Sequence, residues 1–152
     1  MTVKTFGYAQ FCDDIREEKN GKITLVGVYH NDIIVPEIPA FLPKFYIMVN
    51  IVSAEREKQI LPLKIEYGDD IIADGDVVVE FQKNKFHENI ETNETHISLI
   101  FSPFPITKED FLKVKIKIEN EWTIAGQIFV QKNSEKPKKI KKKSSPKKKH
   151  VN

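Results

Sequence analysis

The clearest pattern of hydrophobic and polar positions lies between residues 111 and 130, where the two kinds of residue alternate. Over Phe111–Glu119, Val114, Ile116 and Ile118 share one face, and Lys113, Lys115 and Lys117 share the other. A turn at Asn120-Glu121 leads into Trp122–Val130, where Trp122, Ile124, Ile128 and Val130 occupy alternate positions. A period of two residues is that of a β-strand, so the pattern predicts a β-hairpin.

A less regular alternation recurs earlier in the chain and predicts further strands. They cover residues 3–12, Lys22–His30, Lys44–Ala54, Lys58–Tyr67, Val77–Gln82 and Thr95–Phe101. Asn20-Gly21 supplies the left-handed backbone positions of a hairpin turn, so Asp13–Asn20 is expected to be a charged loop. Gly68–Asp70 and Asp74–Asp76 are expected to be turns around a short apolar piece.

About eight short strands without a convincing helix predict an all-β domain, folded as an antiparallel β-sandwich. A closed barrel is the alternative. Pro62 lies inside the strand expected at Lys58–Tyr67 and lacks a backbone N–H, so this strand is expected at a sheet edge or at a bulge. The domain is expected to span residues 1–131, and residues 132–152 to form a Lys-rich tail.

The overall charge conceals a strong asymmetry between the domain and the tail. Residues 1–131 hold 14 Lys+Arg and 21 Asp+Glu, giving 14 − 21 = −7, whereas residues 132–152 hold 10 Lys and one Glu, giving 10 − 1 = +9. Cys12 is the single cysteine and pairs with no other in the chain. No apolar run approaches the roughly 18 residues of a membrane span, and no signal peptide is evident, so we expect a cytoplasmic protein.

The tail is the strongest functional candidate. It has too few apolar residues to fold, and we expect it to be disordered. A dense cationic segment binds nucleic acid without reading its sequence, because it releases condensed counterions. The candidate polyanion-binding residues are Lys136, Lys138, Lys139, Lys141, Lys142, Lys143, Lys147, Lys148 and Lys149. Alternative roles are solubility, attachment to an anionic membrane surface and a nuclear import signal.

Two acidic clusters are weaker candidates for a hard cation. Asp69, Asp70, Asp74 and Asp76 would suit Ca²⁺, although their spacing is not that of an EF-hand and turn chemistry alone explains them. The second cluster comprises Asp13, Asp14, Glu17 and Glu18, for which a solvated turn paired locally with Arg16 is the simpler interpretation. The lysines at 113, 115 and 117 suit either a solvated strand face or an anion-binding face.

No catalytic constellation emerges from the sequence. The histidines lack ligand spacing, Cys12 has no neighbouring base in the sequence, and the common hydrolase and nucleotide-binding signatures are missing. We therefore expect no enzyme, no catalytic residue, no cofactor and no metal.

Residues 11–29, FCDDIREEKNGKITLVGVY, resemble the opening of an uncharacterised family of small bacterial domains. The hairpin ending Gly126-x-x-Phe129-Val130 is similar to that family's C-terminal hairpin, although the usual glycine before it is missing and the tail lies outside the match. The resemblance implies an immunoglobulin-like or C2-like sandwich and no assigned activity.

Together these features predict a non-enzymatic binding module. The tail is expected to contact nucleic acid or another polyanion nonspecifically, and the sandwich to bind an unidentified protein partner. The alternatives are a C2-like module for Ca²⁺ and anionic lipid, and a structural or assembly protein of phage or secretion type.

Overall fold

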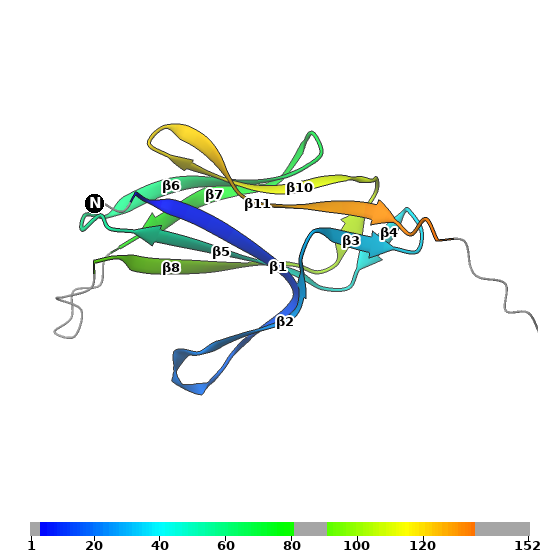
Figure 1. Cartoon of the computed structure of the whole chain (residues 1–152), viewed down its shortest axis with the longest axis horizontal. Coiled ribbons are helices and arrows are strands. Elements are labelled where there is room, and N and C mark those ends of the chain that lie inside the picture. The colour runs from blue at the N-terminus through cyan, green and yellow to red at the C-terminus, as the bar shows by residue number, and fades with distance from the viewer. Residues whose placement is uncertain (1–3, 81–90, 136–152) are drawn as a thin grey trace, which may run out of the picture.

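The computed structural model describes residues 4–80 and 91–135 of the chain, and these form eleven β-strands and one short 3₁₀ turn (Figure 1). The strands are β1 (Phe6–Glu17), β2 (Ile23–Tyr29), β3 (Asp32–Val35), β4 (Ala40–Leu42), β5 (Phe45–Ser53), β6 (Gln59–Tyr67), β7 (Asp70–Val79), β8 (Asn93–Phe101), β9 (Phe104–Ile106), β10 (Asp110–Ile118) and β11 (Glu121–Lys132). The 3₁₀ turn, η1 (Lys19–Gly21), joins β1 to β2.

Two stacked sheets make up the body of the molecule (Figure 1). The four-stranded sheet A has the order β2-β1-β5-β8, and the five-stranded sheet B has the order β3-β11-β10-β6-β7. A small third sheet pairs β4 with β9. Neighbouring strands are antiparallel except for β3 and β11. Both main sheets end in edge strands, so the β-sandwich prediction is confirmed.

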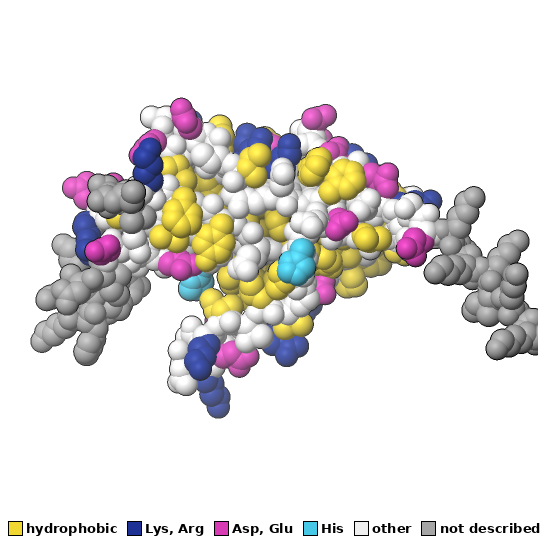
Figure 2. All heavy atoms as spheres, viewed as in Figure 1, with side chains coloured by type: hydrophobic (Ala, Val, Ile, Leu, Met, Phe, Trp, Pro, Cys, Tyr) yellow, Lys and Arg dark blue, Asp and Glu magenta, His cyan; other side chains and the backbone are white. Residues whose placement is uncertain are grey.

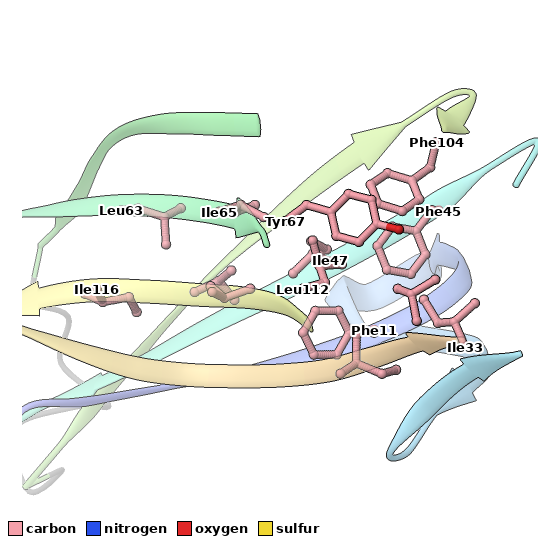
Figure 3. Close-up of a cluster of buried hydrophobic side chains, with 14 of the residues drawn as sticks. Phe11, Ile33, Phe45, Ile47, Leu63, Ile65, Tyr67, Phe104, Leu112 and Ile116 are labelled. Carbon is pink, nitrogen blue, oxygen red and sulfur yellow. The ribbon is translucent and has the colours of Figure 1, made fainter. Parts of the chain in front are cut away.

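The core lies between the inner faces of sheets A and B, where Val49, Ile51, Leu112, Val114 and Ile116 are fully buried. An aromatic cluster closes one end (Figure 3). At its centre Phe45 is fully buried, with its ring centroid 4.9 Å from that of Phe104 and 6.2 Å from that of Phe11. Burial of this apolar surface is the main force that holds the two sheets together.

Three local predictions were wrong. The segment Asp13–Glu17 continues β1 instead of forming a loop, although Asn20 and Gly21 do adopt left-handed φ values of 74° and 73°. The segment Asp74–Asp76 lies inside the continuous strand β7, because it pairs with residues 62–64 of β6. The final hairpin turns at Glu119 and Asn120, whose φ values are 52° and 65°.

Pro62 does not mark an edge, since β6 lies between β10 and β7. The chain tolerates a proline here because the ladder between β10 and β6 ends at the pair Ile116–Leu63, which leaves Pro62 outside it. The edge alternative was therefore wrong. The other expected outcome, a bulge, is present in the pair β6–β7, where the register shifts between Ile65 and Glu66.

Opposite Val114 and Lys115, a β-bulge interrupts the alternation of β11. Residues at alternate positions before and after the bulge therefore face opposite sides of sheet B. Ile128 and Val130 point into the core, whereas Trp122 and Ile124 are 42% and 53% exposed. Beside the bulge β11 approaches β1 closely, because a Cβ atom on Gly126 would lie 3.0 Å from that of Ala9. The predicted alignment of these four apolar residues was wrong, since one extra residue flips a strand's faces.

Candidate functional site

The outer face of sheet B carries a group of lysines on β10 and β6. Leu112, Val114 and Ile116 are fully buried on the inner face, so the alternation of β10 turns the intervening residues Lys113, Lys115 and Lys117 outward. Lys64 lies directly opposite Lys115 on the neighbouring strand β6. We call Lys64, Lys113, Lys115 and Lys117 the lysine face.

One carboxylate joins two of these lysines. Glu66 Oε2 lies 2.7 Å from Lys115 Nζ, and Glu66 Oε1 lies 3.0 Å from Lys64 Nζ. Hydrogen bonds from Lys115 and Lys64 hold the pKa of the Glu66 carboxyl below its usual value, against the opposing effect of partial burial. Two like charges directly opposite one another would repel, and Glu66 offsets that repulsion. This trio keeps a net charge of +1.

The other two lysines rest on aromatic rings. Lys117 Nζ lies 6.0 Å from the centroid of the Trp122 ring, and Lys113 Nζ lies 5.7 Å from that of Phe111. Lys64 Nζ also lies over Trp122, at 4.4 Å. Within residues 4–80 and 91–135, no carboxylate forms an ion pair with Lys113 or Lys117. Their charges therefore remain available, and the lysine face has a net charge of +3 with Glu66 included.

A shallow hollow of about 450 Å³ bounds the lysine face on the side of β7. Trp122, Pro62, Lys64 and Ile71 line it, together with residues 74–76. Asp74 and Asp76 thus limit the positive surface at this edge. Lys64 was not a candidate from the sequence, because its position opposite Lys115 depends on the pairing of β6 with β10.

The structure does not gather the four candidate aspartates. Asp69 lies in the turn before β7, and Asp70 lies 3.3 Å from Lys108 Nζ at the start of that strand. Asp76 is six residues further along β7, which corresponds to roughly 20 Å in an extended strand. Across residues 4–80 and 91–135 no three His, Cys, Asp or Glu side chains cluster as metal ligands would.

The second acidic cluster lies along the β1–β2 hairpin. Arg16 Nε is 3.2 Å from Asp14 Oδ2, which is the local pairing that the simpler interpretation predicted. The Tyr29 hydroxyl donates a hydrogen bond to Asp13, and burial together with this bond raises the pKa of Tyr29 well above its usual value. Both contacts join residues within the hairpin to one another.

Cys12 offers no nucleophile at the surface. Its side chain is fully buried, and burial raises the pKa of its thiol, which disfavours the thiolate. The part of the chain that the structure describes also has no helix long and apolar enough to cross a membrane. The nine tail lysines, from Lys136 to Lys149, lie outside the described residues.

Comparisons with known proteins place the domain in a family without assigning it a role. No curated protein matches the chain. One family model does match, over residues 7–131, which covers the described strands except the first residue of β1 and the last residue of β11 and stops short of the Lys-rich tail. The chain therefore belongs to this family, a family of unknown function (DUF6941).

Proposed function

We propose that this protein is a non-enzymatic binding module that contacts nucleic acid or a similar polyanion without reading its sequence. The observation that carries the proposal is the separation of charge, −7 over residues 1–131 against +9 over residues 132–152. An acidic domain repels a polyanion, so the tail lysines make the main contact. Each lysine that neutralises a phosphate releases counterions and strengthens binding at low salt.

The lysine face supplies a second, smaller contact in this proposal. Its net charge of +3 lies on a domain that is otherwise acidic, and Lys113 and Lys117 have no carboxylate partner among the described residues. Trp122, 42% exposed, lies between Lys64 and Lys117 on this face. The tail therefore raises the local concentration of the protein near a polyanion, and the lysine face adds charge contacts.

Deletion of residues 136–152 tests the proposal. The shortened chain should end after residue 135, because β11 extends to Lys132 and the backbone N–H of Asn133 donates to the carbonyl of Val35. We expect the full chain to bind a fluorescent DNA duplex in an anisotropy titration and the shortened chain to bind it at least about tenfold more weakly. Equal affinities would refute the role of the tail.

We further propose that the sandwich binds a protein partner while the tail holds the polyanion. Figure 2 shows apolar side chains gathered on the visible face over β1. Phe6 and Tyr8 of β1 are 47% and 38% exposed, and Ile100 of β8, on the same outer face of sheet A, is 60% exposed. A Phe6→Asp, Ile100→Asp variant should fold normally and lose its crosslinked partners in cells. Unchanged crosslinks would refute this part.

A further inference from the structure

Over residues 4–80 and 91–135, the sandwich is open along one side, between the edge strands β7 and β8. β7 ends sheet B and β8 ends sheet A, and the two strands are not hydrogen-bonded to one another. A cleft of about 130 Å³ enters the core between them. It is lined mainly by apolar side chains from three strands, namely Leu63, Ile65, Ala73, Val77, Ile97 and Leu99, and is completed by Asp74, Gly75 and Asp76.

Gly75 leaves the floor of this cleft unfilled. A Cβ atom added there would meet no heavy atom within 4 Å, so there is space beside Gly75 for a side chain of another segment. Ala73 and Val77, two residues away on either side, share its face of β7 because a strand repeats every two residues. An apolar side chain inserted beside Gly75 would therefore contact the core.

Neither edge strand carries lysine or proline, two of the usual guards against pairing, although β7 holds a register shift opposite Ile65 and Glu66, near its start. Natural edges are protected by lysines or prolines, yet the sequences DIIADGDVVV of β7 and NETHISLIF of β8 contain no Lys, Arg or Pro. Their only acidic or basic side chains besides His96 are Asp70, Asp74, Asp76 and Glu94. An occupant that suits this site is an extended segment with an apolar side chain flanked by cations.

The tail contains one segment of this kind. Lys138-Lys139-Ile140-Lys141-Lys142 places an isoleucine between two pairs of lysines. The only other aliphatic side chain of the tail outside proline is Val151, which has no lysine beside it. Charge and shape thus both favour the segment around Ile140.

The length of the chain decides whose tail occupies the cleft. Gly75 pairs with Leu63, and Leu63 with Ile116. The N–H of Asn133 donates to the carbonyl of Val35, and extending the β10–β11 register past Asp110 and Val130 places Asn133 nine residues from the level of Ile116. Gly75 is thus nine residues along and three strands across from Asn133, a straight separation of about 34 Å at ~3.4 Å per residue and ~4.8 Å per strand. Seven extended residues, from Asn133 to Ile140, span at most about 25 Å, so Ile140 does not reach Gly75 of its own chain.

We propose that the β7–β8 cleft binds the tail segment 138–142 of a second copy of this chain. Ile140 enters the apolar cleft beside Gly75, the flanking lysines face Asp74 and Asp76, and the backbone of the segment pairs with an exposed sheet edge. The contact joins two different surfaces of the molecule, so it forms either a reciprocal dimer or a growing chain of copies. A tail engaged in this way is withheld from a polyanion, and polyanion binding competes with self-association.

Sedimentation velocity of the full chain over a concentration series tests the inference. The wild-type protein should self-associate at low salt, and Ile140→Ser should raise the apparent dissociation constant about tenfold or more. Val151→Ser is the matched control, since it removes an aliphatic side chain from the same tail, and should associate like wild type. Gly75→Val should also abolish association, because its side chain fills the cleft from within while suiting the strand.

Methyl NMR spectra of the same full-length variants, recorded without nucleic acid, separate this inference from the proposed function. The signals of Val77, Ile97 and Leu99 should move with concentration in the wild type and in Val151→Ser, and stay fixed in Ile140→Ser. A wild-type protein that remains monomeric, or association that is equal in all four proteins, would overturn the inference. If the protein is monomeric at every dilution and these signals still differ between the wild type and Ile140→Ser, the occupant of the cleft is not a second copy, and that result would overturn the inference.

Discussion

Neutralising the unpaired lysines of the lysine face, in the double variant Lys113→Gln, Lys117→Gln, should weaken polyanion binding by a predictable amount. Both lysines rest on aromatic rings without a carboxylate partner among the described residues, so each is free to neutralise one phosphate. The two glutamines keep hydrogen-bonding side chains on the exposed face and leave the buried inner face of β10 unchanged. The fold should therefore be retained.

The magnitude follows from counterion release. Each phosphate contact contributes about −0.9 to the slope of log affinity against log salt, so losing two contacts should make the slope less negative by about 1.8. At about 0.1 M salt, with an unchanged affinity extrapolated to 1 M, this corresponds to an affinity about 60-fold lower. Partial engagement of either lysine would reduce the effect in proportion, and 60-fold is thus the upper bound.

The assay is anisotropy of a labelled DNA duplex, titrated with the full chain between about 50 and 200 mM salt. The control variant Lys19→Gln, Lys22→Gln removes the same charge from η1 and its flank, away from sheet B. It should change the slope by much less than the lysine-face variant. Equal slopes for the wild type and the lysine-face variant would refute a contact at this face. An equal loss of affinity in the lysine-face variant and the control variant would show that only the net charge of the domain matters.

Three further predictions concern stability. Phe45→Ala should lower the free energy of unfolding by about 3–5 kcal/mol in urea, because the ring is fully buried among aromatic neighbours, whereas Phe41→Ala, at a 66% exposed side chain, should change it by less than about 0.5 kcal/mol. The pKa of Glu66 is lowered on folding, so its ion pairs stabilise the protein above the usual pKa of 4.5, and this stabilisation is lost as the pH falls through the lowered value. The variant Glu66→Gln should therefore lose less stability on acidification than the wild type. An unchanged dependence of stability on pH would contradict this. Gly27→Ala should cost about 1–2 kcal/mol, because residue 27 has a φ of 65° and a Cβ there would overlap Asp13, and an unaltered unfolding midpoint would contradict the strain.

The sequence was sufficient where local periodicity alone determines structure. The hairpin β10–β11 follows from strict alternation between Val114 and the lysines around it, and it predicted the outward row of lysines correctly. The left-handed turn at Asn20-Gly21 follows from residue chemistry that few other residues share. Charge asymmetry and the all-β class are also properties of the sequence itself.

The sequence was insufficient where a partner strand determines the outcome. The bulge opposite Val114 and Lys115 turns Trp122 outward, and no local pattern in β11 announces it. Asp74-Gly75-Asp76 has the composition of a turn, yet pairing with β6 holds it in a strand. The contacts of Glu66 with Lys64 and Lys115 also require the register between β6 and β10.

Nonspecific binding through the tail is tested by the salt dependence of DNA binding by the full chain, measured on two duplexes of unrelated sequence. Nine tail lysines between 136 and 149 set a limit of about −8 for the tail's part of the slope of log affinity against log salt. We predict a steep negative slope and equal affinities for the two duplexes at each salt concentration. A flat slope, or affinities that differ more than about tenfold between the two sequences, would contradict nonspecific polyanion binding through the tail.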